Sequence, residues 1–181
     1  METWEWMAVA VAVGFFVFLI ALLAGIRRRR SRLQERFGPE YDRAVSASGQ
    51  RDAERRLSEV ERTHDELDIR PLPAAARERY LDEWRHAEAR FVSDPRDASR
   101  AAERVVVRIL EERGYPVDAD TEEQAAHVAV DHPEVVERYR HGHAMLENVD
   151  GAQSTENLRK AMIDFRAVID ELLDGGRTVA V

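Results

Sequence analysis

The most constraining feature of this sequence is an apolar run from Met7 to Ile26. It holds no charged or strongly polar side chain over about 20 residues, and a helix of that length rises about 30 Å, the thickness of the hydrocarbon core of a bilayer. A helix satisfies its own backbone hydrogen bonds, as lipid requires. The run therefore predicts a single N-terminal transmembrane helix at residues 7–26, preceded by a short stub at 1–6.

The charges on either side of this run predict its orientation. The N-terminal side carries Glu2 and Glu5 and no Lys or Arg, whereas the run is followed at once by five arginines: Arg27, Arg28, Arg29, Arg30 and Arg32. Basic residues next to a span are retained on the cytoplasmic side. We therefore expect a single-pass protein of the cell membrane, with its N-terminus outside and its C-terminal domain in the cytoplasm.

One alternative and two additional roles bear on this N-terminal segment. A cleaved signal peptide would carry its positive charge before the apolar run, and here the order is reversed. The spacing of the pairs Ala10/Gly14 and Ala21/Gly25 permits close approach of two membrane helices, and so self-association. The five arginines could also bind anionic lipid, in addition to setting the topology.

Charge and composition limit what the rest of the chain does. Taking Glu2, Glu5 and the five arginines away from 27 basic and 35 acidic residues leaves 22 and 33, a formal charge near -11. An acidic domain repels phosphate backbones, so we expect no nucleic-acid partner. Cysteine is absent, so the chain offers no disulfide framework and no thiolate ligand.

The remainder of the chain predicts an all-α fold of about five to six helices. Charged residues make up 34% of the sequence, and no run alternates in the manner of a strand. The segments are a basic juxtamembrane segment and linker at 27–49, a cytoplasmic helical domain at 50–174 and a tail at 175–181. The expected helices of the domain cover 50–67, 74–92, 95–113, 121–130, 133–148 and 154–174.

Helical spacing of apolar residues predicts the buried faces of these helices. Helix 50–67 carries a stripe through Leu57 and His64, and helix 133–148 carries one that includes His143. We expect helices 50–67 and 74–92 to form an antiparallel hairpin, because the connection between them is short. Tyr80, Trp84 and Phe91 share one face of helix 74–92 and are interpreted as core rather than as a ligand groove.

Several segments together resemble a family of uncharacterised bacterial proteins of actinobacterial type. They are ERFGPEYDRAV at 35–45, DIRPL at 68–72, RGYP at 113–116, the DHP…YR run at 131–140 and STENLRKAM at 154–162. The similarity covers about residues 35–173. It implies an N-terminal membrane segment followed by a helical domain, and it implies no activity or binding residues.

The most suggestive metal-binding pattern is a pair of Glu-x-x-His motifs, Glu61/His64 and Glu83/His86. On facing helices such motifs supply half of a di-iron carboxylate site, which also needs two further inward carboxylates. His86 lies one residue off the apolar stripe. We therefore interpret His64 as a residue of a helix interface and Glu61 as solvated.

Two other groups of histidines were considered as metal ligands. His127, Asp131 and His132 fall at a helix end, where Asp131 is interpreted as a cap. His141 and His143 are two residues apart, which points their rings away from each other on a helix, and His143 is interpreted as a hydrogen-bonded core residue. We therefore assign no catalytic, cofactor-binding or metal-binding residue.

The sequence contains no phosphate loop, H-E-x-x-H or G-x-S-x-G motif, so we expect a protein that is not an enzyme. The leading hypothesis is a membrane-anchored helical module that binds a protein partner or associates with itself. One alternative is a metal-binding or enzymatic bundle that uses the Glu-x-x-His pairs. The other is an exported, extracytoplasmic helical domain.

Overall fold

The computed structural model describes the backbone of residues 2–117, 121–148 and 154–174, and the side chains of these ranges apart from 2–12 and 121–122. The described residues form eight α-helices and no strand, which confirms the all-α prediction. The helices are α1 (Glu2–Phe37), α2 (Pro39–Ser48), α3 (Gln50–His64), α4 (Ala74–Arg90), α5 (Pro95–Arg113), α6 (Thr121–Asp131), α7 (Pro133–Glu147) and α8 (Ser154–Asp174).

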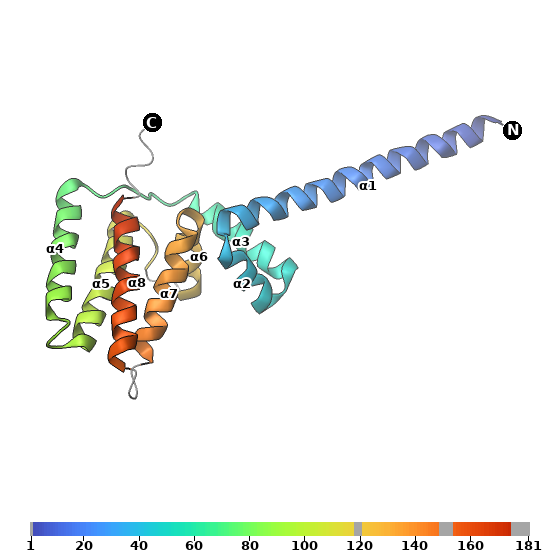
Figure 1. Ribbon diagram of the computed structural model, residues 1–181. Helices are drawn as coiled ribbons and strands as arrows, with labels where there is room; N and C mark the ends of the chain where they lie inside the picture. Colours follow the sequence, from blue (N-terminus) through green and yellow to red (C-terminus); the bar gives the residue numbers. More distant parts are fainter. Residues whose placement is uncertain (1, 118–120, 149–153, 175–181) are drawn as a thin grey trace.

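The helices are arranged as a long rod joined to a bundle (Figure 1). Helices α4, α5, α7 and α8 lie side by side, with α8 packed on both α5 and α7. Helices α2 and α3 pack on each other beside the C-terminal end of α1, and α6 joins them to the bundle. Seven helices therefore follow α1 in the described part of the chain, against the five to six that we expected.

Helix α1 is one continuous helix with two different halves. Its last turns belong to the core, where Leu33 is 1% and Phe37 0% exposed, whereas residues 13–26 project away from the bundle. Among the residues whose side chains are described, no helix has an apolar stretch long enough to cross a bilayer. Residues 7–12 of the expected span lie outside that part of the chain.

The segment expected to be a linker is mostly helical and partly buried. Gly38-Pro39 predicts a break in a helix, and α1 ends just before it at Phe37, where Gly38 has a positive φ and Pro39 opens α2. Helix α2 then buries Tyr41 and Ala44, which are 1% and 6% exposed. The small residues at 46–49 predict a flexible joint, but α2 is helical through Ser48. Residues 27–49 therefore belong to the domain, because α2 covers an apolar face that α3 would otherwise leave open.

The apolar stripes predicted from the sequence account for most of the core. The expected face of α3 is buried, with Leu57 at 1% and His64 at 6% exposure. On α5 and α8, apolar residues at helical spacing are also buried, among them Val105 and Ile109 on α5 and Phe165 and Ile169 on α8. On α4, Trp84 is 2% exposed, which supports its interpretation as a core residue. Burial of an apolar side chain contributes about 1.5 to 3 kcal/mol, so these faces drive the assembly of the bundle.

The predicted hairpin between α3 and α4 is wrong. Helix α3 packs on α2 and α6, whereas α4 packs on α5 and α8, and the two are joined by an extended segment at 65–73 (Figure 1). The backbone N–H of Arg70 donates to the carbonyl of Arg113 at 2.9 Å, and Leu72 is 5% exposed. The 65–73 segment is therefore held across the end of the bundle. Although this segment is short, α3 and α4 do not pack on each other.

Helix α5 begins and ends as its sequence predicts. The side chain of Asp94 accepts a hydrogen bond from the N–H of Asp97 at 3.1 Å, as an N-cap residue does. Gly114 ends the helix in the left-handed region at φ 97°, and a Cβ there would lie 2.6 Å from the carbonyl oxygen of Asp68. Only glycine fits this position without strain.

The buried face of α7 consists of Val135, Val136, Gly142 and Leu146 and does not include the predicted histidine. His143, which we expected in the core, has a side chain that is 48% exposed. The buried residue at this level is Gly142, where a Cβ would lie 3.1 Å from the Cε1 of Phe165. Because glycine lets α7 approach α8 closely, the helix is rotated so that the histidine faces outward.

Candidate functional site

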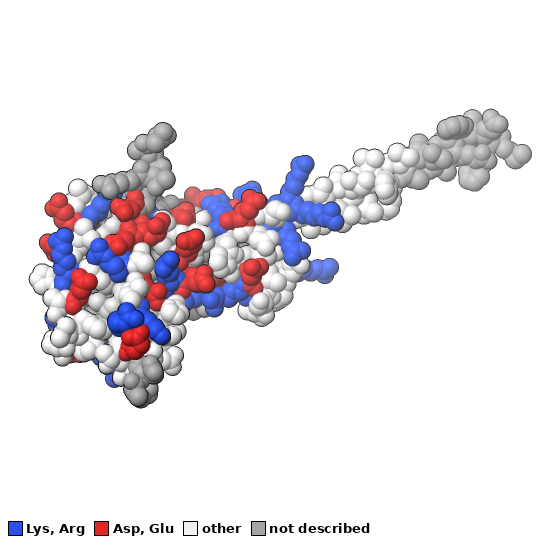
Figure 2. Space-filling model, in the orientation of Figure 1, with Lys and Arg blue, Asp and Glu red and all other residues white. Residues whose placement is uncertain are grey.

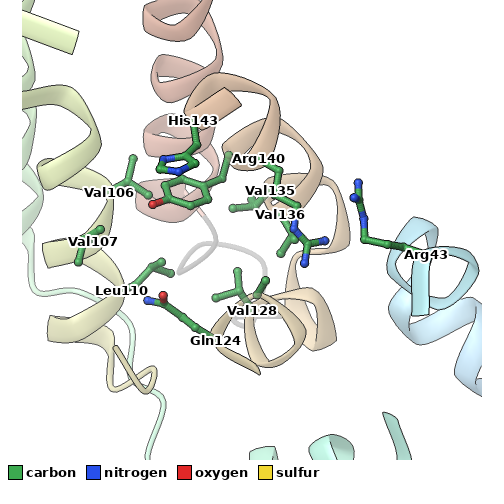
Figure 3. A pocket seen from close by; sticks show the side chains of 12 residues that line it. Arg43, Val106, Val107, Leu110, Gln124, Val128, Val135, Val136, Arg140 and His143 are labelled. Atoms are coloured by element: carbon green, nitrogen blue, oxygen red, sulfur yellow. The ribbon is translucent and has the colours of Figure 1, made fainter. Parts of the chain in front are cut away.

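An apolar pocket of about 210 Å³ opens between α5, α6 and α7, with one residue of α2 at its edge (Figure 3). Its walls are formed by short aliphatic side chains, chiefly valines, and its edge by polar and charged ones. The lining residues are Arg43, Val106, Val107, Leu110, Gln124, Ala125, Val128, Val135, Val136, Tyr139, Arg140 and His143.

The pocket exists because the three helices meet through small side chains. Val106 of α5, Val128 of α6 and Val136 of α7 are 0%, 3% and 4% exposed, so each is anchored in the core. Helix α6 ends at Asp131 and α7 begins at Pro133, so the chain turns sharply there and the two helices diverge from this corner. Valine side chains are too short to fill the space between them.

One side of the pocket is edged by two arginines from different helices. Arg140 of α7 donates to both carboxylate oxygens of Glu40, one of them at 3.3 Å, and the Glu40 side chain is 4% exposed. Arg43 of α2 lies 3.9 Å from the same carboxylate and keeps a side chain that is 55% exposed. Two guanidinium groups therefore contact the same carboxylate at this edge.

The opposite side is closed by a hydrogen-bonded group on α5 and α7. The carboxylate of Glu103 lies 2.5 Å from Nδ1 of His143 and accepts a longer hydrogen bond of 3.4 Å from the hydroxyl of Tyr139. The rings of Tyr139 and His143 stack with their centroids 6.1 Å apart. Burial and the nearby Glu103 charge raise the pKa of Tyr139 to about 12, so its hydroxyl stays protonated.

The volume of the pocket limits its occupant. An engineered apolar cavity of about 150 Å³ holds one benzene molecule, whereas pockets for drug-sized ligands occupy about 300 to 1,000 Å³. A pocket of about 210 Å³ therefore accepts a group the size of one large apolar side chain. The charged residues at its edges would contact the rest of the molecule to which that group belongs.

A second polar cluster lies where α3 meets the end of α6. His64 of α3 places Nε2 3.3 Å from Oδ2 of Asp131, and the hydroxyl of Tyr115 donates to the same oxygen at 2.8 Å. Burial opposes the charged form of Asp131, but these two contacts lower its pKa to about 2. Burial and the Asp131 charge raise the pKa of Tyr115. Asp131 thus ties α3 to the bundle, and does not act as the helix cap that we expected.

Two further histidines extend this cluster. His127 is 4% exposed and stacks on His64 with the ring centroids 6.0 Å apart. Burial and the neighbouring His64 lower the pKa of His127. Burial and the guanidinium of Arg113, which lies 3.2 Å from Nε2 of His132, lower the pKa of His132. The structure therefore favours the neutral form of both imidazoles.

The Glu-x-x-His pairs do not meet in the structure. Glu61 accepts hydrogen bonds from Arg32 at 2.8 Å and Arg36 at 2.5 Å, so it is ion-paired rather than solvated as we expected. Burial opposes its charge, but these bonds lower its pKa overall. His64 turns instead to Asp131. The described residues contain no group of three or more His, Cys, Asp or Glu side chains placed to hold a metal ion.

The other residues with a possible ligand spacing are also separated. Glu83 binds Arg108, and Nδ1 of His86 contacts the carbonyl of Asp82 at 2.7 Å within its own helix. His141 pairs with Asp164 at 2.5 Å, and His143 contacts Glu103 as described above. Each of these histidines therefore has its own partner on a different face.

Sequence reasoning did not find the pocket. Most of its wall residues belong to the buried core, and periodicity cannot tell a filled core position from one that borders a cavity. The partnership of Glu40 with Arg140 joins residues 100 positions apart in the chain. No local signal in the sequence marks either of them.

No protein-family model, curated protein or solved structure matches this chain significantly. The resemblance to an actinobacterial family therefore stays a prediction. The candidate site rests on the geometry of the described residues.

Proposed function

We propose that this protein is a single-pass membrane protein whose helical bundle binds a partner protein. The apolar half of α1 lies in the bilayer, the N-terminus is outside and the bundle is in the cytoplasm. The partner inserts one apolar side chain into the pocket between α5, α6 and α7. In this proposal the protein is a binding module rather than an enzyme.

The observation that carries the proposal is the exposure of α1. Ten large apolar side chains between Val13 and Ile26 are 38% to 67% exposed, with Phe15, Phe16 and Phe18 above 60%. Soluble monomers rarely expose a contiguous apolar surface of this kind. Lipid would cover a helix that is apolar on all sides, whereas a core or a partner helix would cover one stripe of it.

The partner-binding role is supported by the scarcity of other apolar surface. Beyond α1, the described residues include only two large apolar side chains that are well exposed, Val92 at 93% and Ile163 at 53%. These lie on different elements, at the α4–α5 turn and on α8. The interior of an interface is depleted of charge and needs apolar contact. In the described part of the bundle, the pocket offers this apolar contact.

The membrane part of the proposal is tested on cell membranes from the native host or a bacterial expression host. We expect the full chain to stay in the membrane pellet at alkaline pH and to need detergent for release. A reporter fused after Val181 should be active only on the cytoplasmic side. Release into the aqueous fraction would refute the anchor, and activity on the opposite side would favour an exported domain.

The partner-binding part is tested by photo-crosslinking in cells. A photoreactive amino acid at Val107, in the wall of the pocket, should give a discrete cross-linked band, whereas the same group at Ile163 on α8 should not. Substitution of Ala125 by leucine fills the pocket and should abolish the Val107 band. A band at twice the mass of the chain would identify the partner as a second copy. Equal bands with and without the leucine would refute the pocket as the binding site.

A further inference from the structure

Three hydrogen bonds between α1 and α3 share one sequence separation. Arg29 donates to Ser58 at 2.8 Å, Arg32 to Glu61 at 2.8 Å and Arg36 to Asp65 at 3.0 Å, and each pair is 29 residues apart. The contacts advance along both helices in the same direction. Helices α1 and α3 therefore run parallel. The N-terminal end of α3 lies toward the projecting N-terminal half of α1.

This arrangement places the turn between α2 and α3 beside the basic segment of α1. The turn points to the same side of the bundle as the projecting half of α1 (Figure 1). Arg29, just after the apolar run, donates to Ser58, so Arg55, about one turn before Ser58 in α3, lies toward the projecting half of α1. Arg51 lies one turn nearer to the start of α3. Both arginines are exposed.

The two segments brought together here are strongly basic. Residues 27–32 and 50–56 contain eight arginines and two carboxylates, Asp52 and Glu54, a net charge of +6 in a chain whose overall charge is -8. Lys and Arg side chains gather where the rod meets the body of the molecule (Figure 2). Asp52 lies 3.5 Å from Arg55, and both side chains are largely exposed, so this pair is weak.

We infer that the α2–α3 turn rests in the headgroup layer and that Arg51 and Arg55 bind anionic phospholipid there, together with the arginines of 27–30. The inference rests on the proposed membrane anchor and adds a second contact between the bundle and the bilayer. Guanidinium groups bind phosphate in two-pronged hydrogen bonds, and a basic side chain near an anionic surface contributes about 1 kcal/mol.

The rigid link between α1 and the bundle makes this contact specific. The helix is continuous from Glu2 to Phe37, and its last turns are fixed in the core by Leu33 and Phe37. Because α1 is rigidly joined to the bundle where it leaves the bilayer, the α2–α3 turn cannot move far from the membrane surface. A membrane contact on this side holds the bundle in one orientation, with the α4–α5 turn directed away from the lipid.

The absence of cysteine from the sequence allows a direct test. The full chain with Ser48→Cys, at the end of α2, is labelled with a fluorophore and reconstituted into vesicles that contain headgroup spin-labelled lipid. We expect strong quenching in vesicles with about one third anionic phospholipid and at least twofold weaker quenching in neutral vesicles. The control is Val92→Cys at the α4–α5 turn, which should be unquenched in both.

A second pair of variants identifies the side chains. Arg51→Glu with Arg55→Glu should reduce quenching at position 48 in anionic vesicles to the level seen in neutral ones. Arg96→Glu with Arg100→Glu, on exposed positions of α5, should leave it unchanged. Circular dichroism checks that each variant is folded. Strong quenching that does not depend on lipid charge or on these arginines would overturn the inference. A chain that does not float with the vesicles would instead refute the anchor, so the two failures are distinguishable.

Discussion

Glu40 and Arg140 form a two-pronged ion pair that fastens α2 to α7, although the two residues are 100 positions apart in the chain. Their side chains are 4% and 16% exposed. The pair holds the N-terminal helices against the bundle and at the same time forms one edge of the candidate pocket. The attachment of α2 and the shape of the pocket are thus physically coupled.

Removing the carboxylate of this pair should destabilise the fold. Substitution of Glu40 by alanine breaks a largely buried ion pair, a change that costs about 3 kcal/mol. The matched control is Glu59→Ala, whose ion pair with Arg62 is exposed and contributes about 0 to 1 kcal/mol. Chemical denaturation in detergent micelles measures both. Equal effects would mean that the Glu40 pair does not fasten the helices.

Stability should fall as the pH drops below about 6.5, the ordinary pKa of histidine. The pKa values of His127 and His132 are lowered in the folded protein, so the unfolded chain binds protons first as the pH falls. The stability that the two neutral imidazoles contribute is complete above the pKa of histidine in the unfolded chain. It is lost as the pH falls through their lower pKa values in the folded protein. Thermal unfolding at pH 8, 7, 6 and 5 measures the decline.

The same experiment with substituted histidines locates the effect. His127→Gln cannot titrate and should give a shallower decline between pH 7 and pH 5. His86→Gln removes an exposed imidazole that contacts only its own helix in the described contacts, and should keep the slope of the parent chain. Should both variants follow the parent curve, His127 does not contribute to the pH dependence.

Filling the pocket should stabilise the bundle. Ala125 lines the pocket, so leucine at this position occupies empty space and should raise stability by about 1 kcal/mol. Ala126 is the next residue of α6, is 1% exposed and does not line the pocket. Leucine there overpacks the core and should cost about 1 to 3 kcal/mol. Thermal unfolding of the two variants should therefore shift in opposite directions, and a shared loss would mean that the pocket closes in solution.

Alanine substitutions at two glycines compare the stability cost of backbone strain with that of a steric clash. Gly49 and Gly114 both have a positive φ, but a Cβ at Gly49 meets no atom within 4 Å, whereas one at Gly114 would lie 2.6 Å from the carbonyl oxygen of Asp68. Gly49→Ala should cost about 1 to 3 kcal/mol from strain alone, because φ 80° with ψ 160° is a conformation essentially restricted to glycine. Gly114→Ala adds the clash and should cost about 3 kcal/mol or more. Similar losses would show that the 65–73 connection moves away without cost.

The amino-acid sequence by itself determined the helices and most of their buried faces. Proline and glycine end the helices at Gly38-Pro39 and Gly114, and four-three spacing of apolar residues defines the stripes of α3, α5 and α8. These features were predictable because they depend on residues within a few turns of one another. The exposure of His143 was not predicted, because it depends on how closely α7 packs on α8 at Gly142, and α8 lies elsewhere in the sequence.

Only the tertiary structure decided which helices are neighbours and where a site forms. Helix α3 could pack on α4 or on α6 by its pattern alone, and the contacts of His64 with Asp131 and of Glu40 with Arg140 bridge distant parts of the chain. The pocket exists because three helices, separated in sequence, meet through valines too short to fill the gap between them. Such a gap depends on crossing geometry, which the order of residues along one helix does not encode.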